Sequence, residues 1–328
     1  MSELKINVSP VEKKYKYLGG RGLTSKILSE EVPPDCEPLG RENKLIIAPG
    51  LLGGTLAPSS GRLSVGGKSP LTGGIKEANS GGTTAGKLAC LGVKALIIEG
   101  KAPLNNWYIL KIDSQGIELI EGKKILGLDN YEACAELRKE YGSKVGIVIA
   151  GPGAEKGYPM ATVGVTDTEG VPARHAARGG LGSVMASKGL KAIIIDEKEG
   201  RNSAIKSEAE FKNLCRQWSK DLIKERKVLT DVGTANLVSP IDKLGGLPTR
   251  NFSIGSFEEA EKISGEQLTK TIKTRGGNPS HACQRGCTIR CSNIYVDEEG
   301  RHVTSSLEYE TIALTGSNLG ISDLDTIA

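Results

Sequence analysis

Residues 80–99 read Ser80-Gly-Gly-Thr-Thr-Ala-Gly-Lys-Leu-Ala-Cys-Leu-Gly-Val-Lys-Ala-Leu-Ile-Ile-Glu99, and a similar stretch recurs later in the chain. The second stretch opens with Arg178-Gly-Gly180 and ends with Gly189-Leu-Lys-Ala-Ile-Ile-Ile-Asp196. From the second glycine of the pair to the glycine before the apolar run is ten residues in the first stretch and nine in the second. Each stretch predicts a glycine loop, a short helix and a buried strand. We interpret them as an internal pseudo-two-fold repeat; the alternative is a chance similarity between two common units.

The two glycine pairs predict binding sites for anions. A glycine loop that opens a helix directs free backbone N–H groups, and the positive end of the helix, toward a bound anion. We therefore take Ser80, Gly81 and Gly82 as one candidate cofactor-binding loop, and Arg178 with Gly179 as part of a second. Two loops related by a repeat predict two anionic groups bound in related positions.

The segment from residue 1 to residue 200 has the pattern of short strands separated by glycine-rich loops. Apolar, β-branched runs bounded by turn residues predict strands, and such runs lie at 45–48, 95–99, 107–112 and 145–149. Helical patterns are fewer here, at 24–31 and 130–141. We predict an α+β fold in which residues 1–200 form a β-rich base.

After Gly200 the sequence becomes helical in character. Residues 207–227 carry apolar side chains at helical spacing, and Ser256, with glutamates close behind it, predicts a capped helix that runs to Lys273. We predict a second domain, residues 201–328, that is partial, mainly α-helical and the carrier of clustered cysteines.

The composition excludes several classes of protein. The chain has 328 residues, 43 of them glycine, and a formal net charge of +4. The basic residues are dispersed without interleaved aromatic residues, which argues against a nucleic-acid partner. No apolar run reaches the length of a membrane span, and the start of the chain has no apolar signal-peptide core. We therefore expect no membrane association and a cytoplasmic location.

Arg62 and Asn79 lie in a glycine-rich region, 48–82, in which few side chains can fill a core. Arg62 offers a planar fork to a phosphate or to a polar ring edge, and Asn79 offers its amide or its carbonyl. Arg174 and His175 begin the second region, in which two arginines stand four residues apart. By its residues alone, this composition indicates an anion or cofactor site, without the spacing of a dinucleotide-binding or Walker A loop.

Three cysteines near the C-terminal end give the strongest metal signal. Cys283, Cys287 and Cys291 lie within nine residues, and iron–sulfur clusters take thiolate ligands. A zinc site would usually show a two-residue gap and a second ligand pair, and His281 is a weaker candidate ligand. The fourth ligand is expected outside this chain, because the remaining cysteines are scattered singly and are predicted to be buried apolar residues: Cys36, Cys90, Cys134 and Cys215.

The acidic segment Glu308-Tyr-Glu310 follows the cysteines. Its ordinary interpretation is the first turn of a helix, where acidic residues are favoured. A functional interpretation needs more than these three residues.

Taken together, these stretches resemble the aldehyde ferredoxin oxidoreductase family. The similar segments occur in family order over nearly the whole chain: Tyr17-Leu-Gly-Gly-Arg-Gly-Leu23, Ala57-Pro58 with Gly61-Arg62, Lys68-Ser-Pro-Leu-Thr-Gly73, Ala78-Asn-Ser-Gly-Gly82, Arg178-Gly-Gly180 with Val184-Met185 and Ser187-Lys188, and Glu308-Tyr-Glu310.

The resemblance implies a base of β-sheets beneath two molybdopterins that share one tungsten or molybdenum. Arg62, Asn79 and Gly81 would serve one pterin, and Arg174 with the backbone at His175 would serve the other. Mg²⁺ would bridge the pterin phosphates through the carbonyl oxygens of Asn79 and His175. A 4Fe–4S cluster on the three cysteines would pass electrons to ferredoxin or to an iron–sulfur electron-transfer subunit, and Arg62 would lie between cluster and pterin.

The activity implied by the resemblance is the oxidation of aldehydes to carboxylic acids. Glu310 matches the position of a glutamate beside the metal and would be the catalytic acid/base. Three alternatives remain: a relative of the aromatic acyl-CoA reductases, a non-catalytic iron–sulfur or assembly protein that kept the fold, and a nucleotide-binding protein, which only the glycine loops favour.

The sequence departs from the family pattern in two respects. Three residues separate Cys283 from Cys287, whereas the family usually has two, which affects the expected cluster geometry. Family members are also nearly twice as long. The resemblance therefore implies that the fourth cysteine and an active-site histidine lie on a C-terminal half or a partner subunit, and a homo-oligomer is a further possibility.

Overall fold

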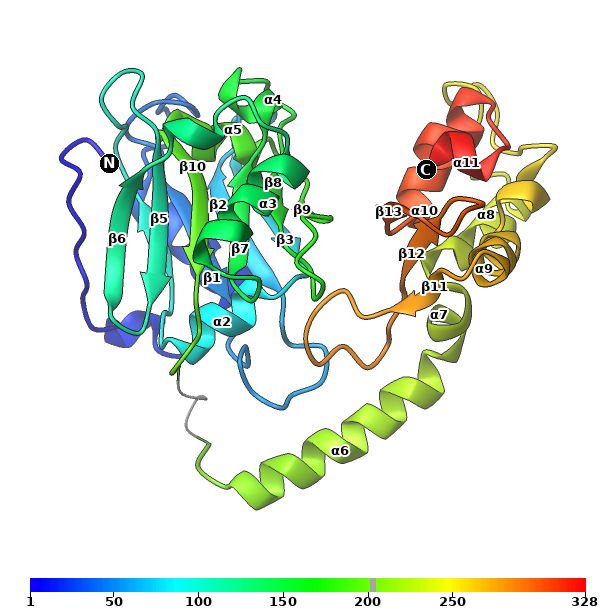
Figure 1. Cartoon of the computed structure of the whole chain (residues 1–328), viewed down its shortest axis with the longest axis horizontal. Helices are drawn as coiled ribbons and strands as arrows, with labels where there is room; N and C mark the ends of the chain where they lie inside the picture. Colours follow the sequence, from blue (N-terminus) through cyan, green and yellow to red (C-terminus); the bar gives the residue numbers. More distant parts are fainter. Residues whose placement is uncertain (201–204) are drawn as a thin grey trace. The chain divides into compact units, whose positions relative to one another are not determined.

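The computed structural model describes residues 1–200 and 205–328, which form two compact units (Figure 1). The first unit contains Met1–Glu208 and also Gln284–Gly286, and the second contains Ala209–Cys283 and Cys287–Ala328. The boundary predicted after residue 200 falls at residues 201–204, which lie outside the described residues. Sheets and helices both contribute to the structure, which confirms the α+β class.

The first unit is built from two sheets and the helices around them. Its elements in chain order are η1 (Lys13–Tyr15), α1 (Gly20–Glu31), β1 (Leu45–Pro49), β2 (Leu63–Lys68), β3 (Ile75–Ser80), α2 (Thr84–Cys90), β4 (Leu96–Ile98), β5 (Tyr108–Asp113), β6 (Gly116–Glu121), η2 (Lys123–Ile125), α3 (Asn130–Tyr141), β7 (Gly146–Ala150), α4 (Pro152–Glu155), β8 (Val163–Val165), β9 (Arg174–Ala176), α5 (Leu181–Ser187) and β10 (Leu190–Ile195).

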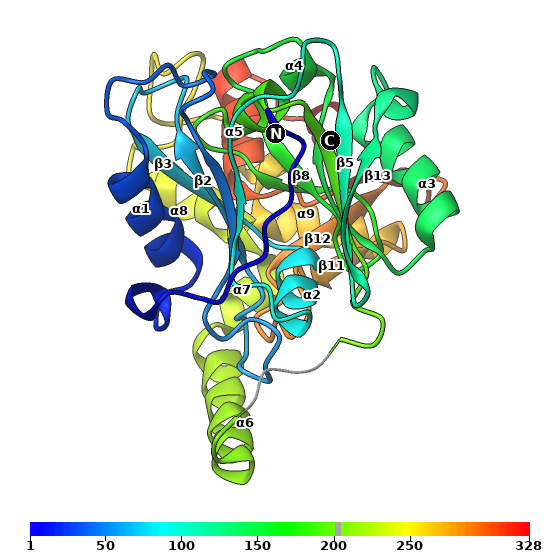
Figure 2. The same ribbon diagram turned by 90° about the vertical axis from the view of Figure 1, so that its left-hand side faces the viewer.

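The two sheets share one interior, which α2 and α5 fill. Strands β1 and β7 are buried along their whole length because a layer covers each face. Ile47 and Val148 face the shared interior, whereas Ile46 packs beneath α1 and Ile147 beneath α3. Figure 2 shows α1 outside the small sheet and α3 outside the large one. This explains why both strands read as continuous apolar runs rather than as alternating patterns.

The topology shows the same unit twice. The small sheet has the strand order β3-β2-β1-β4, and four neighbouring strands of the large sheet have the order β9-β8-β7-β10. All of these pairings are antiparallel. Helix α2 connects β3 to β4, and α5 connects β9 to β10. The predicted internal repeat is therefore confirmed, and it includes three strands that the sequence comparison of the glycine stretches did not cover.

The register makes the repeat residue-specific. In the first copy Ser64 lies opposite Asn79, and in the second copy Gly164 lies opposite His175. Asn79 and His175 are therefore equivalent positions. The glycine pairs are not equivalent, because Gly81 comes two residues after Asn79 whereas Gly179 comes four residues after His175.

Most of the elements predicted for the first unit are confirmed. Helix α3 has the predicted bounds, Asn130–Tyr141, because Asp129 and Glu132 form a reciprocal capping box at its start. Helix α1 begins earlier than predicted, at Gly20.

The second unit combines helices with a three-stranded sheet, ordered β11-β12-β13, which the sequence analysis did not predict. Its elements are α6 (Glu208–Glu225), α7 (Lys227–Val232), η3 (Thr234–Leu237), α8 (Val238–Lys243), η4 (Ala260–Ile263), α9 (Gly265–Thr274), β11 (Asn278–His281), β12 (Ser292–Val296), β13 (His302–Ser305), α10 (Tyr309–Thr311), the π-helix η5 (Ile312–Gly316), η6 (Ser317–Leu319) and α11 (Leu324–Ile327).

The prediction that a helix starts at Ser256 is wrong. Helix α9 starts at Gly265, and Ser264 is its cap, accepting a hydrogen bond from the backbone N–H of Gln267. The Ser256 hydroxyl instead donates to the carbonyl of Asp242. Two serines each precede polar residues at capping distance, and tertiary contacts select the second.

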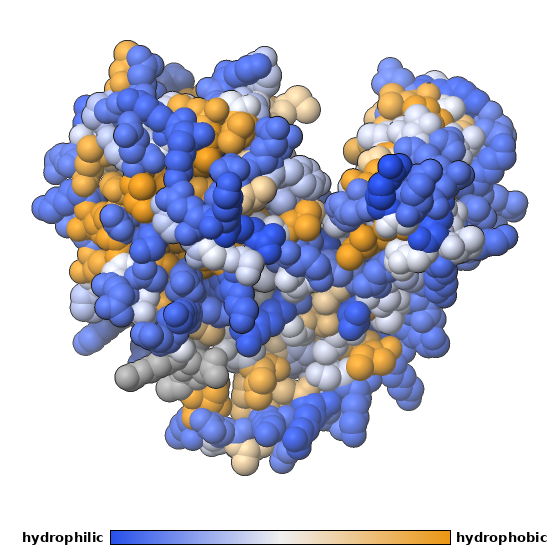
Figure 3. Space-filling view, in the orientation of Figure 1, coloured by the Kyte–Doolittle hydropathy of each residue, from blue (hydrophilic) through white to orange (hydrophobic). Residues whose placement is uncertain are grey.

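Helix α6 confirms the helix predicted at 207–227, but most of its apolar side chains reach the surface. Of its residues only Cys215 is buried, and Leu214, Trp218 and Ile223 are exposed. Figure 3 shows apolar patches among polar atoms in this region. Within residues 1–200 and 205–328, no helix has the length and apolar character needed to cross a membrane.

Candidate cofactor-binding site and cysteine loop

Arg62 and Asn79 come together at the edge of the small sheet. Arg62 directly precedes β2, and Asn79 is the last residue but one of β3. The Nε of Arg62 donates to the side-chain oxygen of Asn79 at 2.8 Å, and Nη2 reaches the Asn79 backbone carbonyl at 3.3 Å. Arg62 is exposed and Asn79 is half-buried, so the guanidinium stands at the surface where a ligand can reach it.

The loop after Asn79 leaves little room for side chains. Gly82 has φ +100°, and a Cβ on it would lie 2.6 Å from the carbonyl oxygen of Thr166. Two hydroxyls beside this glycine, Ser80 Oγ and Thr84 Oγ1, are buried and have no hydrogen-bond partner among the described residues. Buried polar atoms are nearly always paired in native proteins, so a group absent from the polypeptide is the natural partner.

Arg174 and His175 lie on β9, which runs beside β3. Arg174 is buried, and the Nδ1 of His175 is hydrogen-bonded to the hydroxyl of Thr162 at 2.8 Å. Desolvation and, to a smaller extent, the positive charge of Arg174 lower the pKa of His175 below its usual value. His175 is nevertheless accessible. The lowered pKa favours the neutral imidazole of His175.

The second glycine pair is explained by packing. The hydroxyl of Ser69 donates to the carbonyl of Gly179 at 2.8 Å, and a Cβ on Gly179 would lie 2.4 Å from Cγ of Lys76. At Gly180 a Cβ would lie 1.9 Å from the carbonyl oxygen of Pro159. Lys76 stands four residues before Ser80, about 13 Å along β3. The structure thus places β9 beside β3, but it places Gly179 beside the beginning of β3 and Ser80 at the end.

Arg178, like Gly179, lies near the beginning of β3 and not near its end. It is exposed and directly precedes Gly179, so it is separated from the Asn79 loop along β3. Its role as a ligand remains a prediction.

The residues Gln284–Gly286 attach to the first unit through three contacts. Gln284 forms a parallel β-bridge with Gly82. The backbone N–H of Ser59 donates to the carbonyl of Gly286 at 3.0 Å. Arg285 forms an ion pair with Glu197 at 3.3 Å. No motif in the sequence indicates these pairings, because each joins residues more than 80 positions apart.

The three clustered cysteines lie in the loop between β11 and β12. All three are half-buried, and the described part of the chain forms no disulfide. The backbone N–H of Arg290, which has φ +54°, donates to Sγ of Cys287 at 3.4 Å. Hydrogen bonds to sulfur help to set the potential of iron–sulfur clusters. The hydroxyl of Thr230 donates to the carbonyl of Ile289 at 2.7 Å and holds the loop to α7.

The acidic segment begins a short helix, as its ordinary interpretation predicts. Glu308 directly precedes α10, and the hydroxyl of Thr234 donates to its carboxylate. The same hydroxyl accepts the backbone N–H of Tyr309 at 3.0 Å. Glu310 is exposed. Sequence reasoning missed Thr234, whose position after Gly233 carries no recognisable motif.

The prediction for the scattered cysteines is confirmed for Cys36, Cys134 and Cys215, which are buried, and wrong for Cys90, which is half-buried. Burial raises the pKa of Cys134 to about 12. Burial and, to a smaller extent, the negative charge of the nearby Glu197 raise the pKa of Cys90 as well. Cys90 sits at the end of α2, where that helix meets solvent.

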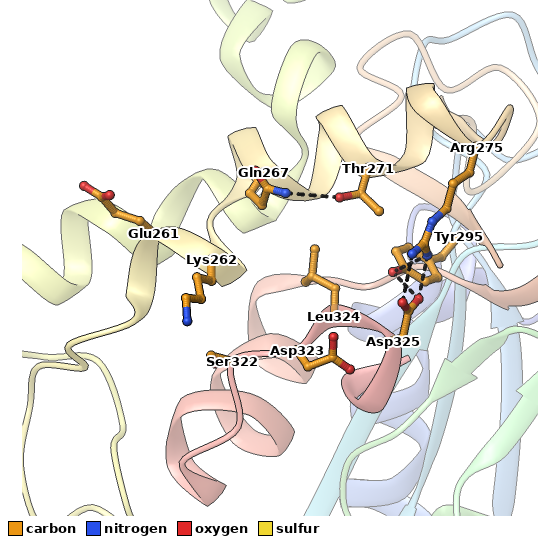
Figure 4. A pocket seen from close by; sticks show the side chains of 10 residues that line it. All are labelled: Glu261, Lys262, Gln267, Thr271, Arg275, Tyr295, Ser322, Asp323, Leu324 and Asp325. Carbon is orange, nitrogen blue, oxygen red and sulfur yellow. Dashed lines mark hydrogen bonds and ion pairs between the residues drawn. The ribbon is translucent and has the colours of Figure 1, made fainter. Parts of the chain in front are cut away.

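The second unit also contains a cavity of about 560 Å³ (Figure 4). Arg275 and Asp325 form a double ion pair in it, with distances of 2.5 and 2.8 Å, and Tyr295 donates to the same carboxylate at 2.7 Å. The pKa of Asp325 is lowered to about 2, mainly by the hydrogen bond from Arg275. Arg275, Tyr295 and Asp325 therefore satisfy one another without a ligand.

These features define an α+β protein with a duplicated sheet base and a unit that carries clustered cysteines. The chain belongs to the aldehyde ferredoxin oxidoreductase family. Residues 1–197 match the model of the aldehyde ferredoxin oxidoreductase N-terminal domain, and residues 213–328 match that of domains 2 and 3 of the same enzyme.

Relatives extend the comparison. The tungsten-containing aldehyde ferredoxin oxidoreductase of Thermococcus kodakarensis is 37% identical over 99% of this chain and 52% of its own length. The protein of the same description from Pyrococcus furiosus is also 37% identical, with the same coverage. The WOR-like subunit of an aliphatic sulfonate oxidoreductase from Pyrococcus furiosus is 28% identical over 95% of this chain. The chain spans about half the length of these relatives.

One solved structure shows the same fold. It is described as the active-site complex BamBC of benzoyl coenzyme A reductase with 1,5-dienoyl-CoA. The TM-score is 0.76 at 24% identity, with 97% of this chain and 48% of that chain covered.

Proposed function

We propose that the chain is the N-terminal part, or the N-terminal subunit, of a tungsten- or molybdenum-containing bis-molybdopterin oxidoreductase. The enzyme would oxidise aldehydes to carboxylic acids and pass electrons through a 4Fe–4S cluster to ferredoxin. The observation that carries the proposal is the equivalence of Asn79 and His175 in two copies of one sheet, on strands that lie side by side. Two related edges of this kind suit two copies of one cofactor.

The residues fit an anionic cofactor at the first edge. Ser80 and Thr84 bury hydroxyls with no partner among the described residues, and hydroxyls can donate to phosphate oxygens. Between these two hydroxyls, Gly82 is buried and has φ +100°, and a side chain there would collide with Thr166. Arg62, held by Asn79, presents a guanidinium suited to a phosphate or a ring edge.

At the second edge, Arg174 is buried and would supply the positive charge for the other pterin. His175 would offer its backbone carbonyl, as Asn79 does on the first edge, and Mg²⁺ would bind between them. Oxygen ligands of this kind are those that Mg²⁺ prefers. Because the imidazole pKa is lowered, His175 adds no charge of its own at neutral pH.

The metal and its dithiolenes would supply the two-electron redox change when bound. The protein would position the substrate and move protons. Of the two acids, Glu308 is held by Thr234, whereas Glu310 is exposed and is the carboxylate available to accept or donate a proton. Cys283, Cys287 and Cys291 would hold the cluster, and the fourth ligand would come from the completing polypeptide.

Elemental and cofactor analysis of the anaerobically purified protein tests the proposal. We expect tungsten or molybdenum, with two pterins per metal, and aldehyde-dependent reduction of a viologen dye by the completed enzyme. The chain alone should show no such dye reduction. Robust turnover by the chain alone would overturn the proposed division of the site. Iron without tungsten, molybdenum or pterin would instead support a non-catalytic iron–sulfur protein.

A further inference from the structure

We propose that Gln284 is a ligand of the pterin at the Ser80–Gly82 loop and accepts a hydrogen bond from a ring N–H through its side-chain oxygen. This inference rests on the proposed function. It adds a residue from the cysteine loop to a cofactor site whose members predicted from the sequence all lie within residues 62–179.

The first observation is the position of the side chain within the first unit. Gln284 forms a β-bridge with Gly82, which lies in the predicted pterin loop. A Cβ on Gly61 would lie 3.5 Å from both Cδ and Oε1 of Gln284. The Gln284 amide therefore lies beside the backbone that leads directly into Arg62.

The second observation is an unpaired buried atom. Gln284 is only 2% exposed, and its Oε1 has no hydrogen-bond partner among the described residues. The side-chain oxygens of Ser59, Ser80 and Thr84 are likewise buried and have no hydrogen-bond partner among the described residues. Ser80 and Thr84 flank Gly82, and Ser59 binds Gly286, so these four atoms belong to the contacts around one loop. Unpaired buried oxygens are costly, and their concentration here indicates a ligand that satisfies them.

The four oxygen atoms differ in their hydrogen-bonding chemistry, so they suit different parts of the ligand. A hydroxyl can donate to a phosphate oxygen, whereas an amide oxygen can only accept. Phosphate esters offer acceptors, and a pterin ring offers N–H donors. The hydroxyls of Ser80 and Thr84 therefore suit the phosphate, and Oε1 of Gln284 suits the heterocycle.

The backbone around Gln284 is fixed without the ligand. Gly286 accepts from Ser59 at 3.0 Å, and Arg285 binds Glu197, which also binds Lys87 at 3.1 Å. A binding group held in place before the ligand arrives loses little entropy on binding. In sequence, Gln284 directly follows Cys283, so a pterin ligand and a predicted cluster ligand would be consecutive residues.

The test compares Gln284→Leu with the wild-type protein in two forms. The cofactor-free form is made in a host unable to synthesise molybdopterin, and the holo form is purified anaerobically from the protein's own cells. Gln115→Leu, in the exposed turn between β5 and β6, is the matched control. Gln284→Met serves if the branched side chain disrupts packing. The readouts are the melting temperature and the rate of pterin release, followed by fluorescence after oxidation.

We expect effects of opposite sign in the two forms. Removing an unpaired buried oxygen should raise the melting temperature of the cofactor-free protein by about 2 °C or more. In the holo form, pterin should be released about tenfold faster, the size of one lost hydrogen bond. Gln115→Leu should change neither readout.

Two results would overturn the inference alone: a lower melting temperature of both cofactor-free variants, Gln284→Leu and Gln284→Met, or pterin release at the wild-type rate from a variant holo protein that contains pterin. The absence of pterin from the wild-type protein purified from its own cells would overturn the proposed function, and the inference with it.

Discussion

Asn79 and His175 occupy equivalent positions in two copies of one four-stranded unit, Asn79 opposite Ser64 and His175 opposite Gly164. Their side chains have different partners: Arg62 binds Asn79, and Thr162 binds His175. What the two copies share is the backbone. A ligand bound to both edges would therefore meet equivalent carbonyl and N–H groups, with side chains that distinguish one edge from the other.

Arg62→Ala should weaken cofactor retention with little effect on folding. Arg62 is exposed, and surface substitutions usually change the free energy of unfolding by about 0.5 kcal/mol or less. We expect pterin and metal per chain to fall several-fold. Pterin fluorescence and elemental analysis measure the loss, and Arg216→Ala on α6 is the control. Equal pterin in the wild-type and Arg62→Ala proteins would contradict the assignment of Arg62.

Gly82→Ala should destabilise the first unit strongly. Its φ of +100° is strained for alanine, and the Cβ would lie 2.6 Å from Thr166 O. We expect a loss of about 2–4 kcal/mol in the free energy of unfolding. Gly92→Ala is the matched control, because Gly92 has φ +73° but open space around it, and should cost about 1 kcal/mol. Equal losses in the two variants, measured by chemical denaturation, would refute the steric explanation.

Lys188 should make stability depend on pH in the alkaline range. Its ammonium is buried and donates to Gly40 O at 2.9 Å, and burial lowers the pKa of Lys188 from 10.5 to about 8. Between these values the unfolded chain binds more protons than the folded one, so stability rises with pH.

Lys188→Met removes this titration. The stability of the wild-type protein relative to the variant should rise between pH 8 and pH 10 by up to about 1.4 kcal/mol per pH unit. Chemical denaturation at pH 8, 9 and 10 measures the difference. A difference that stays constant over this range would show that Lys188 does not titrate there.

Thr234→Val should release the acidic segment. The variant loses the hydroxyl that binds the Glu308 carboxylate and the Tyr309 N–H, at a cost of about 1–3 kcal/mol. Amide hydrogen exchange at residues 308–311 should become faster, and aldehyde oxidation by the completed enzyme should decrease. Thr234→Ser keeps the hydroxyl and should behave like the wild-type protein. Unchanged exchange in the valine variant would exclude Thr234 as a positioning residue.

The sequence predicted the elements whose signals are local. Helix α3 has a capping box within its own first turn, and β1 and β7 have apolar runs that only strands covered on both faces require. The repeat was visible because its glycines and apolar strands recur at similar spacing.

The remainder depends on contacts between distant residues. Ser264 rather than Ser256 caps α9, because Ser256 is used in a contact with Asp242. Strand β11, Asn278–His281, is short and polar and has no strand pattern of its own. The attachment of Gln284 beside Gly82 joins residues that no motif relates, so the candidate site was incomplete without the structure.

Helices α2 and α5 fill the single interior that the two sheets share, with Leu88 and Val184 completely enclosed in it. Protein interiors pack as densely as organic crystals, so side-chain volume there sets how far apart the edges of the two sheets stand. The width available to the proposed pair of cofactors would therefore be set by residues inside this core, away from the proposed binding edges. Exposed loops can change in sequence without altering that width, whereas a smaller side chain at Leu88 would alter it from within.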